Sequence, residues 1–360
     1  MLRTRALSLP FLTVFLSCAT ASLPIPEAWM STPQAPRVGP VELGADGAVR
    51  AVPRPAGPAA SVRIETRPEG QVLVRDGVTL TPPFPAIQSF DVSLDRREIA
   101  FSAKRADNFD VALVALEGSA VNWIPEDPAD ETDPKWALRG NKFSYVLRTP
   151  SGDFVRTIHV LTAFQLTIDF PDSVVNSLAW DSASERFAVT FESPEASERV
   201  EVMKYGGEER RRAMDAAVRL DYSLEPFGPG SLLMRPSSMR YEEKLPIVVW
   251  MTGGRLNEWD DARGALLGST RAGCIITTAA PGDALWERVR GLPWADGNRI
   301  FVVNATAFPV SAPAPAVVIR GSTAVPSGRY RREERSLVVA PAGVKSFAAG
   351  FVAEALKIEN

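Results

Sequence analysis

The sequence of 360 residues predicts β-propeller-like antiparallel blades followed by a small doubly wound α/β domain. In the first half, short strands with alternating apolar residues recur at Phe90, Trp136 and Trp180, which are 46 and 44 residues apart. That period suits one four-stranded blade. In the second half, continuous apolar runs alternate with helix-like segments, as in a parallel sheet buried on both faces.

The first 17 residues are typical of a secretory signal peptide. The positively charged MLRTR precedes an apolar stretch over residues 6–17. This stretch is shorter than the ~20 residues that a membrane-spanning helix needs. We therefore expect the chain to leave the cytoplasm.

Two cleavage sites compete directly after this stretch. Phe15-Leu16-Ser17-Cys18 is similar to a bacterial lipobox, which makes Cys18 the lipidated first residue of an outer-membrane lipoprotein, facing the periplasm or the cell surface. The alternative is ordinary cleavage at Ala21, after Ala19-Thr20-Ala21, which gives a soluble periplasmic or secreted protein. A cysteine at the end of the apolar stretch favours the lipoprotein.

Residues 18–61 are rich in proline and alanine without a sustained period, which predicts an extended tether. Residues 62–230 follow as the blade region, with three clear repeats and a faint one at 62–85. The α/β region covers 231–360. Its expected strands are 247–251, 274–279, 300–304, 316–321 and 336–341, and its expected helices are 258–271, 283–290 and 344–357.

Composition excludes several kinds of function. A net charge of −3 leaves no basic surface for nucleic acid. The single histidine, His159, and two cysteines, Cys18 and Cys274, are too few for a His/Cys zinc site, and no nucleotide-binding motif is present, so we expect no metal and no cofactor. His159 is expected to pack within a blade and Cys274 within a core strand.

An acidic cluster lies near the expected carboxyl end of strand 247–251. Glu258, Asp260 and Asp261 could bind a cation there, because α/β sites gather at that edge. The interpretation we favour is that they cap the following helix and complement its dipole.

The blade repeats resemble TolB-type propeller repeats at 99–101 and 108–111, which read IAF and NFDV. The second half resembles the prolyl oligopeptidase family in several segments that follow that family's order. The segments are SLLMRPSSMRYEEKLPIVVWMTGG (231–254), GALLGSTRAGCIITTA (264–279), ADGNRIFVVNATAF (295–308), PAVVIRGSTAVP (315–326) and LVVAPAGVKSF (337–347).

This resemblance implies positions for a catalytic triad, and the residues there do not match. The serine of the G-x-S-x-G turn falls on Thr306, and its flanking glycines fall on Asn304 and Phe308. The histidine falls on Val344, and the histidine of the family's His-Gly-Gly falls on Thr252. The acid should follow Gly321, where Ser322-Thr323-Ala324 offers no carboxylate.

We therefore expect no enzymatic activity. The chain is interpreted as a non-catalytic envelope lipoprotein that binds or scaffolds a protein partner, a pseudoenzyme of the prolyl oligopeptidase type. One alternative is a weak or atypical peptidase or esterase that uses Thr306, with Lys345 as the base. The other is a periplasmic module that binds a small ligand or a sugar.

Overall fold

The computed structural model describes residues 22–357 except 31, 39–40, 45, 52–60, 94–96, 119, 126, 241, 307–309, 311, 313–315, 324, 326, 328 and 334–335. The signal peptide, Cys18, Ala21 and Phe308 lie outside the described residues. The chain divides into two compact units. The blade unit comprises Pro36–Arg219 and Asn257–Trp259, and the sheet unit comprises Met1–Ala35, Leu220–Leu256 and Asp260–Asn360.

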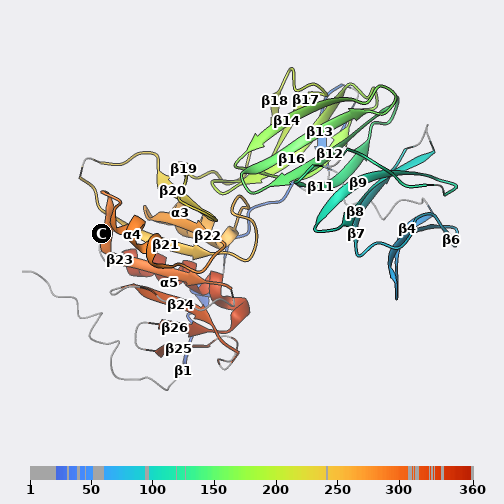
Figure 1. Cartoon of the computed structure of the whole chain (residues 1–360). Coiled ribbons are helices and arrows are strands. Elements are labelled where there is room, and N and C mark those ends of the chain that lie inside the picture. Colours follow the sequence, from blue (N-terminus) through green and yellow to red (C-terminus); the bar gives the residue numbers. More distant parts are fainter. Residues whose placement is uncertain are drawn as a thin grey trace, which may run out of the picture. The chain divides into compact units, whose positions relative to one another are not determined.

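The blade unit contains three antiparallel sheets of four strands each, as the repeats predict (Figure 1). A three-stranded sheet precedes them in the chain, at the place of the faint repeat. We call the four-stranded sheets blades 1, 2 and 3. The three-stranded sheet is β4 (Val62–Arg67), β5 (Gly70–Arg75) and β6 (Val78–Thr79); blade 1 is β7 (Ile87–Val92), β8 (Glu98–Arg105), β9 (Asn108–Ala115) and β10 (Asn122–Trp123); blade 2 is β11 (Asp130–Trp136), β12 (Lys142–Thr149), β13 (Gly152–His159) and β14 (Phe164–Pro171); blade 3 is β15 (Val174–Trp180), β16 (Arg186–Ser193), β17 (Ala196–Lys204) and β18 (Arg211–Met214).

Two of the three residues that mark the sequence repeat occupy equivalent places in the blades, whereas Phe90 lies two residues before Val92, which is the residue equivalent to Trp136 and Trp180. Phe90, Trp136 and Trp180 each lie in the first strand of their blade. Trp136 lies opposite Phe143 on the next strand, and Trp180 lies opposite Phe187, with ring centroids 5.1 and 5.3 Å apart. Such cross-strand aromatic pairs stabilise a sheet beyond the area that they bury.

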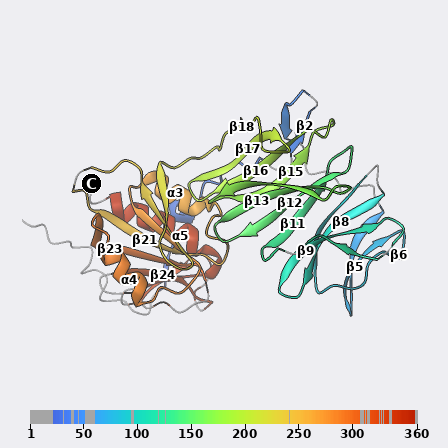
Figure 2. The same cartoon turned by 45° about the horizontal axis from the view of Figure 1, so that its top comes forward.

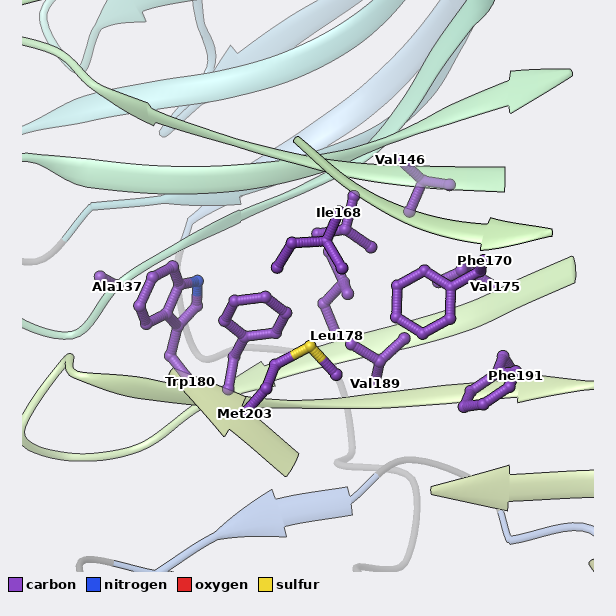
Figure 3. Close-up of a cluster of buried hydrophobic side chains, with 12 residues drawn as sticks. Ala137, Val146, Ile168, Phe170, Val175, Leu178, Trp180, Val189, Phe191 and Met203 are labelled. Atoms are coloured by element: carbon purple, nitrogen blue, oxygen red, sulfur yellow. The ribbon is translucent and has the colours of Figure 1, made fainter. Parts of the chain in front are cut away.

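Consecutive blades bury their facing side chains against one another. Figure 3 shows the core shared by blades 2 and 3, where the Phe170 and Phe191 rings meet edge to face at 5.0 Å. Alternate residues of each strand point into this layer, which is the period-two pattern of the sequence. The core comprises Ala137, Val146, Val155, Ile168, Phe170, Val175, Leu178, Trp180, Phe187, Val189, Phe191 and Met203.

The sheet unit is built on a nine-stranded sheet in the order β1-β25-β26-β24-β23-β21-β22-β20-β19. Strands β22, β21, β23, β24 and β26 are parallel, and antiparallel strands extend both edges. Its strands are β1 (Ser22–Pro24), β19 (Tyr222–Pro226), β20 (Ser231–Pro236), β21 (Leu245–Met251), β22 (Gly273–Thr277), β23 (Ala295–Asn304), β24 (Val317–Gly321), β25 (Arg329–Glu333) and β26 (Ser336–Val339). Because β19 and β20 form a hairpin in this sheet, the unit begins earlier in the chain than residue 231.

The helices of this unit match the expected segments closely and cover both faces of the sheet (Figure 2). They are α3 (Asp261–Ser269), α4 (Asp283–Arg290) and α5 (Val344–Lys357), with the short η2 (Pro341–Gly343) before α5. Trp286 and Val289 of α4 pack on Ile247, Val249 and Met251 of β21. Helix α5 packs against α3. The connections β21–α3–β22 and β22–α4–β23 run in opposite directions along the sheet, so the right-handed rule for such connections puts α3 and α4 on opposite faces.

Part of the range expected to be a tether is folded. Strand β1 pairs antiparallel with β25, and α2 (Glu27–Met30) packs on α5. The Trp29 ring meets Phe347 and Phe351 edge to face at 5.4 and 5.5 Å, and its Cα lies 2.5 Å from where a Cβ on Gly350 would stand. Farther along, β2 (Val41–Leu43) and β3 (Val49–Ala51) form a hairpin beside blade 3. The sequence did not predict these elements because each has only three or four residues, which is too short to show a period within a proline-rich segment.

No helix among the described residues is both long and apolar enough to cross a membrane.

Candidate functional site

The topology of the sheet unit marks one place where a site is expected. The connection after β21 leads to β22 on one side, and the connection after β23 leads to β24 on the other. Ligands of open α/β sheets bind where such connections diverge, outside the carboxyl ends of the strands. Met251 and Asn304 are partners in register at these ends. Thr252 and Thr306, which follow them, therefore lie at the switch point, as the resemblance implies.

Thr306 is held by the side chain of Asn304, which ends β23 and is buried. The Asn304 Oδ1 accepts the Thr306 backbone N–H at 3.0 Å and the Thr306 hydroxyl at 2.8 Å. Asparagine commonly forms such a turn with the backbone two residues on. The hydroxyl thus donates to an amide oxygen, which is far too weak a base to remove its proton.

Thr252 forms a similar local turn at the end of β21. Its backbone N–H donates to the Thr277 carbonyl at 2.9 Å, and its side-chain Oγ1 accepts the Gly254 N–H at 3.1 Å. An oxyanion hole needs backbone N–H groups that point at the substrate oxygen. Here the Gly254 N–H is directed at the chain's own threonine instead.

The position expected for a catalytic histidine is filled by aliphatic packing. Val344 begins α5 and is 2% exposed. A Cβ placed on Gly321, at the end of β24, would lie 3.2 Å from the Val344 Cγ2 and 3.0 Å from the Pro341 Cα. The start of α5 therefore packs tightly on the backbone of β24 at this point.

Lys345, the alternative base, forms an ion pair with Asp260. Asp260 is the N-cap of α3, and its Oδ1 accepts the Arg263 N–H at 3.0 Å. Burial acts to raise the pKa of Asp260, but the positive charges of Arg263 and Lys345 outweigh it and hold that pKa below its usual value. The ammonium in such an ion pair has no lone pair with which to accept a proton.

These contacts confirm that Asp260 caps the helix after β21. Asp261 lies in the first turn of α3, where a negative charge complements the helix dipole. Among the described residues, no group of three or more His, Cys, Asp or Glu side chains is arranged to hold a metal ion.

The other two candidates from the sequence lie on strands other than those whose ends form the switch point. His159 ends β13 in the blade unit, and its Nδ1 lies 3.1 Å from the Thr162 hydroxyl. Cys274 is fully buried in β22, and burial raises the pKa of its thiol to about 12. Cys274 is therefore a core residue as expected, and His159 lies on a blade strand as expected but is only partly buried there.

Sequence reasoning missed the role of Asn304, which it treated only as a replaced glycine. The signal was present, because Asn-x-Thr after a buried strand permits the turn seen here. It also missed that Asp260 and Lys345 pair, since 85 residues separate them. The switch point therefore has the ends of β21 and β23 and the Thr306 hydroxyl. Its threonine side chains form hydrogen bonds with Asn304 and with the backbone of Gly254.

No protein-family model matches the chain, and no curated protein matches it. Solved structures do. An acylaminoacyl peptidase from Pyrococcus horikoshii superposes with a TM-score of 0.51 and 12% identity, over 71% of this chain and 48% of that one. A variant of prolyl oligopeptidase B from Galerina marginata, bound to a 25mer macrocyclization substrate, gives a TM-score of 0.50 and 11% identity, over 80% and 61%.

The chain therefore has a fold similar to that of prolyl oligopeptidases and acylaminoacyl peptidases, with propeller-like blades followed by a mixed α/β sheet. It spans about half the length of these structures, 48% of the first and 61% of the second.

Proposed function

We propose that this protein is a non-catalytic binding or scaffold protein built on a prolyl oligopeptidase-like fold. The observation that carries the proposal is the bonding of Thr306, whose hydroxyl donates to the Asn304 amide. Two further contacts agree with it. Val344 fills the histidine position with packing against Gly321, and Lys345 is paired with Asp260.

The loss of catalytic power expected from these changes is large. Removing a single member of a serine–histidine–acid triad lowers kcat by ~10⁴-fold or more. Here the serine, the histidine and the acid are all absent from the positions that the family resemblance implies. The remaining fold keeps rigid sheets with loops at their ends, which suit binding of a partner.

Hydrolysis of p-nitrophenyl esters and of peptidyl p-nitroanilides tests this proposal. We expect the wild-type rate to equal the rates of Thr306→Ala and of Thr79→Ala, a matched control at an exposed threonine of β6 in the blade unit. Turnover that Thr306→Ala abolishes and Thr79→Ala retains would contradict the proposal and support a hydrolase.

The hydrolase alternative rests on one specific observation, which is the location of Thr306 at the switch point of the sheet. It requires a neutral Lys345 that is released from Asp260. Activity by this route would be increased by Asp260→Asn, which removes the charge that holds the lysine.

We further propose that the protein is an envelope lipoprotein anchored through Cys18, with a protein partner in the same compartment. The support is the lipobox-like sequence at the end of an apolar stretch. Incorporation of labelled palmitate that Cys18→Ala abolishes is the expected result. If Cys18→Ala and wild type were divided equally between the membrane and soluble fractions, and if the mature N-terminus were Ser22, cleavage at Ala21 would be supported instead.

A further inference from the structure

Exposed apolar side chains gather on one end of blades 2 and 3. Large apolar residues that are exposed number seven among the described residues, and four lie on hairpins at this end. The hairpins are β11–β12, β13–β14 and β17–β18, which all turn at the same end of their antiparallel blades. The four residues are Leu138, Leu161, Phe164 and Tyr205, with exposed fractions of 47, 66, 59 and 37%.

The two blades are joined at this end by hydrogen bonds. The Ser184 hydroxyl, in the β15–β16 turn, accepts the Arg139 backbone N–H at 2.7 Å. The Ser184 carbonyl accepts from the Lys142 Nζ at 2.9 Å. The hairpins therefore form one continuous surface within the blade unit. A cluster of apolar groups on such a surface marks an interaction site more often than scattered single residues do.

A pocket of about 230 Å³ opens within this surface, and we call it the Lys142 pocket. Its apolar walls include Phe164, Leu166 and Tyr205, and its polar lining includes Lys142 and His159. The volume is below the ~300 Å³ at which pockets begin to enclose drug-sized ligands. It suits one large side chain together with a small polar group.

The charge in the pocket is positive and partly stripped of water. The Lys142 ammonium lies 4.0 Å from the centre of the Tyr205 ring and 5.7 Å from that of Trp180. Lys142 makes no ion pair within the described part of the chain. Burial lowers its pKa, while the more distant Glu185 and Asp181 act in the opposite direction. A partly buried ammonium has lost some of its hydrating water. A carboxylate that replaces this water forms a charge-assisted hydrogen bond and stabilises the ammonium.

His159 supplies a second polar contact beside the lysine. It is the cross-strand partner of Lys142, so both side chains belong to adjacent strands at the same level of blade 2. Its ring Nδ1 lies beside the Thr162 hydroxyl. A group that contacts Phe164 with an apolar side chain could place a carboxylate near both residues.

We propose that the Lys142 pocket binds the C-terminus of a partner protein, with a large apolar last residue against Phe164 and Leu166 and the terminal carboxylate on Lys142. The proposal rests on the binding function proposed above and gives that function a place and a ligand class. The apolar walls supply burial, and the charge on Lys142 selects a free carboxylate over a neutral end.

Fluorescence polarisation with two labelled peptides tests the proposal. Both have the sequence Gly-Ser-Gly-Ala-Leu-Phe with fluorescein at the N-terminus, and one ends in a free carboxylate while the other ends in an amide. We expect the free acid to bind the full-length protein about tenfold more tightly than the amide, since one charge-assisted contact contributes about 1.5 kcal/mol or more. Lys142→Met should remove this preference, and Lys142→Arg should retain it.

Phe164→Ser should weaken both peptides, whereas Val78→Ser, an equally exposed apolar residue on β6, should weaken neither. Equal affinity for acid and amide, no binding of either at 1 mM, or full preference in Lys142→Met would overturn the proposal. So would a dimer that Phe164→Ser dissociates without affecting peptide binding, because the surface would then belong to a second copy. Ester hydrolysis on the same preparations tests the proposed function separately.

Discussion

Glu131 is a buried carboxyl group between blades 1 and 2, and its replacement by glutamine should stabilise the blade unit at alkaline pH. The residue lies in β11 and is 0% exposed. Its Oε2 accepts the Val111 N–H of β9 at 2.9 Å, and its Oε1 accepts the Tyr145 hydroxyl at 3.4 Å. Burial, together with the neighbouring Asp110 charge, raises its pKa from 4.5 to about 7, against the opposing effect of the Val111 N–H.

Whether stability rises or falls with pH follows from the pH at which Glu131 loses its proton in the unfolded and in the folded state. The unfolded chain releases the Glu131 proton near pH 4.5, and the folded protein retains it until about pH 7. Between these values the folded state binds the extra proton, so its stability falls as pH rises and then becomes constant. A difference of about 2.5 pKa units at ~1.36 kcal/mol each gives a loss of about 3 kcal/mol.

Glutamine keeps an acceptor for the Val111 N–H without carrying a charge. We therefore expect Glu131→Gln to be more stable than wild type by up to about 3 kcal/mol at pH 8 and nearly equal to it at pH 4.5. Native-state hydrogen exchange of amides in β9 and β11 measures the opening free energy of this unit directly. Glu69→Gln, on an exposed turn of the same unit, makes the same charge change and should have little effect.

The reasoning would be refuted if wild type were equally stable at pH 5 and pH 8. It would also be refuted if Glu131→Gln destabilised the blade unit at pH 8.

Asp260→Asn should lower the stability of the sheet unit by about 0.5–1 kcal/mol at pH 7, because it removes the ion pair with half-exposed Lys345. The pKa of Asp260 is lowered in the folded protein, so its carboxylate stabilises the fold only while it is ionised. The difference between the variant and wild type should therefore vanish as pH falls below about 4. Asp260→Ala should cost about 1 kcal/mol more through the lost cap, as urea unfolding would show. Trp29→Ala should release the N-terminal segment, with a loss of about 2–3 kcal/mol from two edge-to-face contacts and partial burial, and protease should then cleave before residue 36. Gly152→Ala should prevent or strongly weaken folding of blade 2, because φ is +137° and the added Cβ would lie 2.6 Å from the Phe170 carbonyl oxygen; near-native thermal stability would contradict this.

Much of the fold could be predicted because its signals are local. Strand alternation and the spacing of Phe90, Trp136 and Trp180 define the blades, since each blade pairs neighbouring segments of the chain. The helices α4 and α5 begin and end where the apolar pattern predicts. Strand β1 could not be found in this way, because three residues pair with a strand some 300 residues away. The only local signal was Trp29, a large aromatic residue in a proline-rich segment.

In the candidate site, the positions of the residues could be predicted from the sequence, but their contacts could not. The positions of Thr252, Thr306 and Val344 at strand ends and at a helix start follow from the order of segments. What the side chains do there depends on partners that spacing does not reveal. Asn304 replaces a glycine in sequence terms, and in the structure it accepts the Thr306 hydroxyl. The Lys142 pocket is lined by residues of blade 2 and by Tyr205 of blade 3, so the sequence repeat of a single blade does not predict it.

The most direct test of the central claim is the intact mass of the protein after incubation with a fluorophosphonate, followed by peptide mapping. The reagent labels only a hydroxyl that a base has activated. Because the Thr306 hydroxyl donates to an amide oxygen, we predict an unchanged mass after hours at a reagent excess that labels a serine hydrolase completely. A single stoichiometric adduct on Thr306 would contradict the account and establish the protein as a hydrolase.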